Sequence, residues 1–242
     1  EPSEITTRHT AQLLEEFPNS GSAGPVRQLA LASLFQTGKY PEALKIATES
    51  LGTLKEGTPE HDLCLHVLGA SLYYTGQHTK ARPFLDDHVT RYPASPTAQA
   101  SLYFQGANLA KLRAWDEACP LLDVFIAKFP DASGNPYLPY ALYDRATCHF
   151  ADAENAEALA DISRLEKDFP ALPILENALT LAGNIQRAEG KPDEAKKLYL
   201  KALELAGTRK NNAVAAEALA QLVSLLAGKS RKEAVPFADR FW

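Results

Sequence analysis

The chain has 242 residues, of which 45% are hydrophobic, and its formal net charge is −5. This acidic balance disfavours a general nucleic-acid-binding protein, and no apolar stretch approaches the roughly 18 residues that a membrane-spanning helix needs. The three cysteines, Cys64, Cys119 and Cys148, form no C-x-x-C pair, so the sequence predicts no disulfide framework.

The first predicted element is a helix at residues 5–17, which ends at the pair Phe17-Pro18. Later helices end in the same way, so we expect a lone half-repeat at 5–18. Residues 19–24, with the sequence NSGSAG, indicate a flexible connector rather than a domain boundary. The chain begins with Glu1 rather than Met, which leaves open that it is part of a longer protein.

Beyond the connector, an alanine recurs in a similar phrase at steps of 37–40 residues. These alanines are Ala43, Ala81, Ala118, Ala158, Ala195 and Ala234. Most follow a turn that starts with glycine, as in Gly38-Lys-Tyr-Pro-Glu-Ala43, although the phrase before Ala158 is degenerate. Aromatic-proline pairs close three repeats, as in Tyr92-Pro93, where proline ends a helix because it lacks an N–H. A fixed period of this size is typical of a solenoid.

Each repeat is predicted to be two antiparallel helices joined by a tight turn. The predicted helix pairs are 25–37 with 40–52, 61–75 with 78–91, 97–112 with 115–128, 137–151 with 155–168, 173–189 with 192–206, and 211–227 with 230–241. In four repeats a small residue lies 12 positions before the alanine, at Gly69, Gly106, Ala146 and Gly183. We expect the two helices to approach closely there.

The small residue, the Gly-x-x-x-Glu-Ala turn and the terminal proline, in that order, resemble the tetratricopeptide repeat family. The resemblance covers roughly residues 25–242, although the units have 37–40 residues rather than the usual 34. It implies an all-α, right-handed superhelical solenoid of about six repeats, whose first helices line the concave face. The domain prediction is therefore one solenoid over residues 1–242, with the half-repeat at 5–18 and repeats at about 25–60, 61–96, 97–136, 137–172, 173–210 and 211–242.

Members of this family bind peptides or protein segments in the concave groove and are rarely catalytic. Mapping the first helices by helical period gives a tyrosine-rich inward face. The candidate groove residues are Phe35, Tyr73, Tyr74, Tyr103, Tyr140, Tyr143, Phe150, Asn184 and Arg187. Tyrosine suits peptide recognition because it buries a large area and keeps a hydroxyl for backbone groups. The alternative for any one ring is packing between neighbouring first helices.

Other residue patterns favour neither catalysis nor metal binding. His61 and Cys64 share a helix face, but His66 lies about 180° from His61, and two ligands do not complete a zinc site. Cys148 and His149 are adjacent and diverge by about 100° on a helix. The sequence contains no phosphate-binding loop and no nucleophile elbow. We therefore expect no enzyme activity, no metal and no cofactor.

The sequence thus predicts a non-catalytic scaffold that binds a peptide or protein segment in a tyrosine-lined groove. The alternatives are a structural subunit of a bacterial envelope assembly, docking through its convex face or ends, and an accessory domain of a larger enzyme. We expect a protein or peptide partner, no nucleic acid, and self-association through the C-terminal repeat. The aromatic-proline repeat ends are similar to those of bacterial envelope tetratricopeptide proteins, which favours a periplasmic or cell-envelope location over the cytoplasm.

Overall fold

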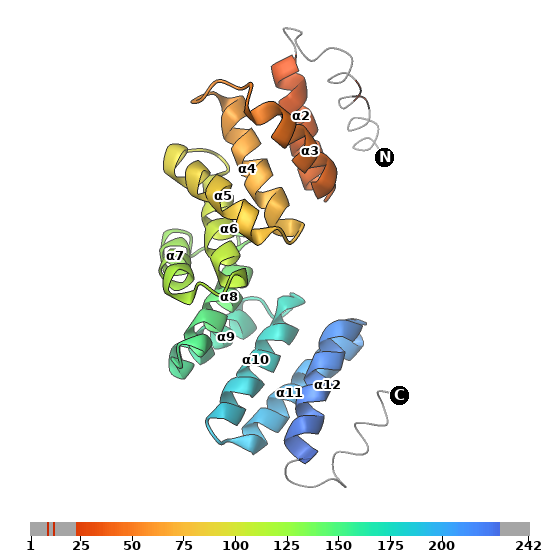
Figure 1. Cartoon of the computed structure of the whole chain (residues 1–242). Helices are drawn as coiled ribbons and strands as arrows, with labels where there is room; N and C mark the ends of the chain where they lie inside the picture. The colour runs from red at the N-terminus through yellow and green to blue at the C-terminus, as the bar shows by residue number, and fades with distance from the viewer. Residues whose placement is uncertain (1–8, 10–11, 13–22, 228–242) are drawn as a thin grey trace. The chain divides into compact units, whose positions relative to one another are not determined.

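The computed structural model describes residues 9, 12 and 23–227, and in this part of the chain it consists of eleven α-helices without a strand (Figure 1). The helices are α2 (Ala23–Gln36), α3 (Tyr40–Leu51), α4 (Pro59–Tyr74), α5 (His78–Arg91), α6 (Ala98–Lys111), α7 (Trp115–Lys128), α8 (Leu138–Ala151), α9 (Asn155–Asp168), α10 (Ile174–Ala188), α11 (Pro192–Thr208) and α12 (Asn212–Ala227). Each begins and ends within two residues of its predicted limits, and the all-α fold is confirmed. Apart from His9 and Gln12, the predicted half-repeat lies outside the described residues, as does the predicted helix at 230–241.

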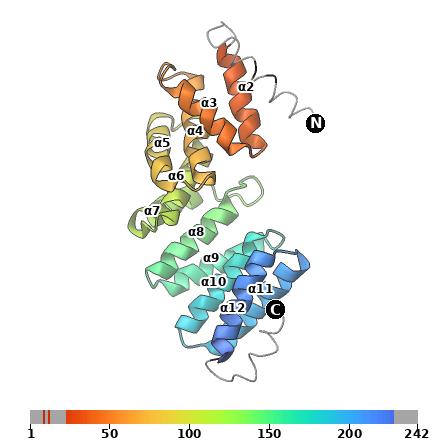
Figure 2. The ribbon, with the colours of Figure 1, turned by 45° about the vertical axis from the view of Figure 1, so that its right-hand side comes forward.

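The chain forms two compact units, residues 1–121 and 122–242, which we call unit 1 and unit 2. In unit 1, α4 packs against α2, α3, α5 and α6, and in unit 2, α10 packs against α8, α9, α11 and α12 (Figure 2). A first helix therefore contacts its own second helix, both helices of the repeat before it and the first helix of the next repeat. This is the packing of stacked helical hairpins. The single solenoid over residues 1–242 stays a prediction.

A recurring turn ends five of the first helices, α2, α4, α6, α8 and α10, and explains the glycines of the sequence pattern there. At Gly76, φ is +74°, and the N–H of the next residue, Gln77, donates to the carbonyl of Leu72 at 2.8 Å. This is the hydrogen-bond pattern of a Schellman motif, which needs one residue in the left-handed region. Glycine adopts this conformation without the steric cost of a Cβ. Arg113 and Ala153, with φ of 59° and 60°, adopt it where the glycine is missing.

The expected close approach of the paired helices is confirmed at two of the small residues. A Cβ added at Gly69 would lie 2.8 Å from Cδ2 of Leu85, and one added at Gly183 would lie 2.6 Å from Cδ1 of Tyr199. Both distances are shorter than side chains tolerate in a close-packed interior. The glycines therefore allow Leu85 on α5 and Tyr199 on α11 to pack directly against the backbone of the first helix.

Unit 2 contains a fully buried carboxylate. Glu176, on α10, is 0% exposed, and its Oε1 accepts from Nη1 of Arg209 at 3.2 Å while its Oε2 accepts from Nδ2 of Asn211 at 2.8 Å. Arg209 also donates to the backbone carbonyls of Leu172 and Pro170, at 2.9 and 3.0 Å. Because a buried charge needs a partner of opposite charge, these contacts hold the loop after α11 against the start of α10.

Candidate functional site

Five aromatic rings of unit 1 pack together, and we call them, Phe35, Tyr40, Tyr73, Tyr74 and Phe104, the aromatic surface. Tyr40 and Tyr74 are stacked, with ring centroids 4.3 Å apart and an interplanar angle of 9°. Phe35 lies 6.0 Å and Phe104 5.4 Å from the centroid of Tyr74. Tyr74 is nevertheless 46% exposed. An exposed ring is thus held in place by three neighbours.

The helix ends explain why these rings meet. Phe35 lies in the last turn of α2, and Tyr73 and Tyr74 end α4. Because first helices alternate with antiparallel second helices, α2 and α4 run in the same direction and their C-terminal turns lie at the same edge of unit 1 (Figure 1). Tyr40 opens α3 directly after the turn at Gly38, so it lies at this edge as well.

The structure brings three of the four predicted residues of unit 1 together at this edge and buries the fourth. Phe35 and Tyr73 are half-buried and Tyr74 is exposed. Tyr103 is only 5% exposed, and its ring packs 5.3 Å from that of Phe104. Tyr103 therefore supports the aromatic surface from within unit 1, which is the packing alternative stated for these rings.

The five predicted residues of unit 2 lie on α8 and α10. Tyr140 is 40% exposed, Arg187 is exposed, and Tyr143 and Phe150 are half-buried. Burial, with the nearby negative charges of Asp144 and Glu217, raises the pKa of Tyr143 to about 12. The fifth residue, Asn184, accepts a hydrogen bond of 2.8 Å from the buried hydroxyl of Tyr199, so its carbonyl stabilises the unit. The contact of these residues with a ligand stays a prediction.

Two residues of this edge were missed because they follow the turn rather than lie on a first helix. Tyr40 and His78 are the first residues of α3 and α5, each two positions after the turn glycine. The ring of His78 lies 5.4 Å from that of Tyr73. An aromatic residue two positions after the turn glycine is the sequence signal that could have found both.

Directly beneath the aromatic surface lies a buried histidine. His66, on α4, is only 4% exposed, and its ring lies 5.5 Å from Phe35 and 6.3 Å from Phe104. Its Nδ1 is hydrogen-bonded to Oγ of Ser101, on α6, at 2.7 Å. Burial, together with the nearby His88, lowers the pKa of His66 to about 3, so this imidazole is uncharged at neutral pH.

A second buried histidine lies beside it. His88, on α5, is 0% exposed, and its ring centroid is 5.6 Å from that of His66. Its Nε2 lies 2.7 Å from Oδ1 of Asp62, whereas its buried Nδ1 has no hydrogen-bond partner among the described residues. Burial lowers the pKa of His88, although Asp62 and Asp87 act in the opposite direction.

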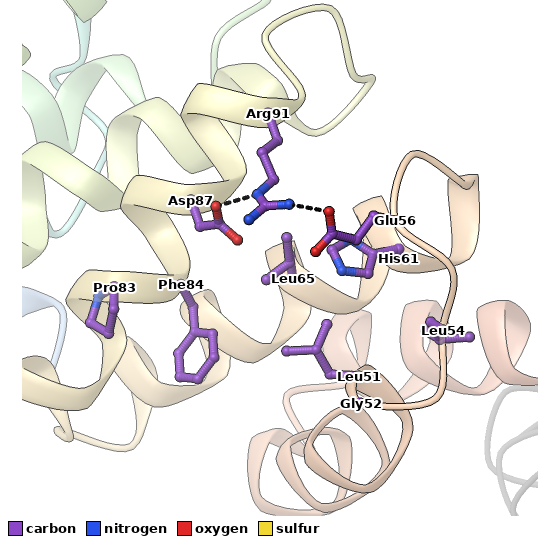
Figure 3. A pocket seen from close by; sticks show the side chains of 10 residues that line it. All are labelled: Leu51, Gly52, Leu54, Glu56, His61, Leu65, Pro83, Phe84, Asp87 and Arg91. Atoms are coloured by element: carbon purple, nitrogen blue, oxygen red, sulfur yellow. Dashed lines mark hydrogen bonds and ion pairs between the residues drawn. The ribbon is translucent and has the colours of Figure 1, made fainter.

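A pocket of about 590 Å³ opens between the second helices of unit 1 (Figure 3). Its lining residues are Leu51, Gly52, Leu54, Glu56, His61, Leu65, Pro83, Phe84, Asp87 and Arg91. Arg91 donates to Glu56 at 2.6 Å and also to Asp87, so its charge is balanced by two carboxylates at the rim. The pocket thus combines an apolar wall from Leu51, Leu65 and Phe84 with a rim of paired charges.

The residues that the structure describes form no metal centre, and the thiol of Cys64 is buried. None of the groups of His, Cys, Asp and Glu in this part of the chain could hold a metal ion. Nor is any described helix both long and apolar enough to span a bilayer. Cys64 is buried and lies 3.2 Å from the carbonyl of Ala47. Burial raises the pKa of its thiol to about 12, so Cys64 remains a packed thiol.

The comparisons with known proteins identify the repeat and the fold. Residues 178–213, which include α11, match the model of the tetratricopeptide repeat family, whereas no curated protein matches the chain. MamA (41-end) from Desulfovibrio magneticus RS-1 is a similar solved structure, with a TM-score of 0.62 and 19% identity, covering 78% of this chain and 97% of that chain. YrrB, a TPR protein with an unusual peptide-binding site, has a TM-score of 0.59 and 15% identity, covering 86% of this chain and 96% of its own.

The TPR-like repeats of a putative kinesin light chain from Podosopora anserina also have a similar structure. Their TM-score is 0.58 at 18% identity, and the match covers 78% of this chain and 98% of that chain. At these identities the likenesses show the fold alone. The recurring turn, the periodic alanine and the tetratricopeptide repeat matched at 178–213 agree with this fold.

Proposed function

We propose that the chain is a non-catalytic protein-interaction scaffold, and that unit 1 binds a peptide or protein segment on its aromatic surface. The observation that carries this proposal is the stack of Tyr40 on Tyr74, whose outer ring is 46% exposed. A large exposed aromatic ring that is already fixed loses little entropy on binding, and such rings dominate the energetics of interfaces. YrrB, which carries a peptide-binding site on this fold, supports the same class of function.

The chemistry of the surface indicates the kind of segment that it would bind. Tyr40, Tyr73 and Tyr74 offer ring faces for an apolar or aromatic side chain, and their hydroxyls suit the polar backbone of an extended peptide. Separately, we propose that in unit 2 the exposed Tyr140 and Arg187 contact a ligand segment, with Arg187 suited to a carboxylate. Phe150 and Tyr143 would supply apolar area beside them.

The test is the affinity of a peptide selected by phage display against the full chain. Tyr74→Ala should raise the dissociation constant of that peptide about 30-fold, because an interface aromatic at the centre of a site contributes on the order of 2 kcal/mol. The matched control is Leu29→Ala on α2, since Leu29 is 51% exposed and lies outside the aromatic surface. The control should bind as the unmodified chain does.

The result that overturns the proposal is a selected peptide whose affinity is the same in Tyr74→Ala and Tyr40→Ala as in the unmodified chain. Circular dichroism at 222 nm checks that each variant keeps its helices. Because Tyr74 is 46% exposed and lies at the surface of unit 1, a variant that keeps its helices and loses affinity reports on the contact itself.

A second candidate is the assembly role, in which a partner docks on the second helices. The pocket beside Phe84, with its apolar wall, favours this role because it fits an apolar side chain of a partner. Phe84→Ala should then release the partner while Tyr74→Ala retains it. Co-purification of a partner with each variant measures this. Loss of the partner in Tyr74→Ala and its retention in Phe84→Ala would instead support the aromatic surface.

Self-association through the C-terminal repeat is also proposed. We expect the mass of the full chain, measured by light scattering, to rise with protein concentration. A mass that stays at that of one chain from micromolar to millimolar concentration would contradict it.

A further inference from the structure

The two buried histidines beneath the aromatic surface, His66 and His88, form what we call the histidine pair. His66 belongs to α4 and His88 to α5, and both rings are almost fully buried. The centroid distance of 5.6 Å leaves little room for water between them. Two groups that gain charge near pH 6.5 in water are therefore enclosed together at the junction of these helices.

The hydrogen bonds around the pair suit uncharged rings. Asp62, on α4, accepts from Nε2–H of His88 at 2.7 Å and also from the hydroxyl of Ser95 at 2.9 Å. With its proton on Nε2, His88 keeps a lone pair on Nδ1, for which no donor is found among the described residues. His66 shares a hydrogen bond of 2.7 Å with the hydroxyl of Ser101, which serves an uncharged ring equally well as donor or acceptor.

A proton added to either ring meets an unfavourable environment. On His88 it would reside on Nδ1, where the N–H would be buried without an acceptor among the described residues, which is unfavourable. On His66 it would create a cation next to a second imidazole, in a site whose other neighbours are Phe35, Phe104 and Ser101. Burying such a charge without a counter-charge is far more costly than burying a neutral ring.

The charged and titratable groups that face the pair come from the helices packed against it. Asp62 of α4 and Asp87 of α5 are negative and act on His88. Tyr92, after α5, packs its ring 5.7 Å from that of His88. The contacts of His66 with α2 and α6 are made by uncharged side chains. The negative groups thus lie on the His88 side, and His66 receives no compensating charge.

We propose that the histidine pair is an acid-sensitive switch of unit 1, in which uncharged rings let α4, α5 and α6 pack together and protonation opens this packing. The opening would disturb the aromatic surface, because His66 supports Phe35 and Phe104, and both of these rings support Tyr74. The effect on a bound peptide rests on the function proposed above, whereas the opening itself does not.

The direction and size of the effect follow from linkage. The pKa of His66 is lowered to about 3 in the folded chain, so the unfolded or opened chain takes up the proton first. Stability is therefore complete above the ordinary pKa of about 6.5 and is lost as the pH falls below it. Between pH 7 and pH 5 this one group raises the equilibrium constant for opening about 25-fold.

The test is hydrogen exchange of the full chain at pH 7 and pH 5, with intrinsic exchange rates corrected for pH. We expect the corrected opening of α4–α6 to increase about 25-fold, whereas α10–α12, which contain no histidine, should change less than threefold. Equal changes in both sets of helices, or no change in α4–α6, would overturn the proposal.

A pair of matched variants isolates the histidine. His66→Gln retains an amide that can bond to Ser101 but cannot titrate, so its pH 5 to pH 7 ratio should fall several-fold below that of the unmodified chain. The control His149→Gln alters a histidine of unit 2 that pairs with Glu154 on its surface, and the full ratio should remain. Because each ratio is taken within one variant, a change in overall stability does not obscure it. A full ratio in His66→Gln would contradict the switch.

The selected peptide provides the second readout. Its dissociation rate from the unmodified chain should rise between pH 7 and pH 5, and this rise should be smaller in His66→Gln. If the peptide does not depend on Tyr74 at any pH, the proposed function fails while the exchange result still decides the switch. If exchange increases but the dissociation rate of a Tyr74-dependent peptide does not, the link between switch and ligand is wrong.

Discussion

The two units share one architecture but bury different polar groups. Unit 1 encloses His66 and His88, which are neutral at pH 7. His66 is hydrogen-bonded to the hydroxyl of Ser101, and His88 to the carboxylate of Asp62. Unit 2 encloses Glu176 and Asp161, each held by an arginine. The comparison teaches that the repeat pattern specifies apolar contacts between helices, while the polar groups among them decide how each unit responds to its surroundings.

The ion pairs of unit 2 keep their positive partner over the whole ordinary pH range, because that partner is an arginine. Arg145 donates to both carboxylate oxygens of Asp161, at 2.8 and 2.6 Å, and to Asp123 at 2.7 Å. Although burial opposes it, these bonds and charges raise the pKa of Arg145 above its ordinary value. In unit 1, Asp62 is bonded to His88, a group that can gain or lose its charge, and acid is therefore expected to act there first.

The largest expected effect comes from removing a cation from unit 2. Arg209→Met leaves Glu176 fully buried without its charged partner, and we expect the free energy of unfolding to fall by about 3–5 kcal/mol. Urea denaturation followed by circular dichroism measures the change. The control is Lys210→Met, because Lys210 is the exposed neighbour and should change stability by less than about 0.5 kcal/mol. Equal losses in the two variants would show that the contacts to Glu176 are unimportant.

The next effect compares the two helix crossings. Gly183→Ala places a methyl against the ring of Tyr199, which is fully buried and bonded to Asn184, so we expect a loss of about 2 kcal/mol. Gly69→Ala meets mainly the end of the Leu85 side chain, which can rotate away, and alanine has the better helix propensity by about 1 kcal/mol. The loss at Gly69 should therefore be clearly smaller in the same urea experiment. A larger loss at Gly69 than at Gly183 would show that the backbone contact of Leu85 dominates.

The fold could be predicted from the sequence because its signals are local. The structure describes five of the periodic alanines, among them Ala43 and Ala81, and each is 0% exposed. The alanine therefore recurs where the paired helices pack against each other. The turn glycines and the prolines act through the backbone itself, which makes helix ends readable to within two residues. How the repeats group into two units could not be predicted, because no sequence motif marks the division near Leu121.

The candidate site could be predicted only in part. Helical period placed Phe35, Tyr73 and Tyr74 on one side of unit 1, and the structure brings them together. The period could not show that Tyr103 would be buried, since burial depends on the size of the neighbouring side chains. It also overlooked Tyr40, which lies outside the first helices. The burial of His88 was not foreseen either, because a histidine on a second helix reads as an exposed residue.

The smallest effect concerns the turn that both units share. Ala153, in unit 2, has φ of 60° where Gly76, in unit 1, has φ of 74°, and a side chain in this region costs about 1–2 kcal/mol. Ala153→Gly should therefore stabilise the chain by about 0.5–1 kcal/mol, since the freedom of glycine in the unfolded chain offsets part of the relief. Gly76→Ala should destabilise it by a comparable or slightly larger amount in urea denaturation. If Ala153→Gly lowers stability instead, the methyl of Ala153 contributes more by packing than the backbone conformation costs, and the turn is then specified differently in the two units.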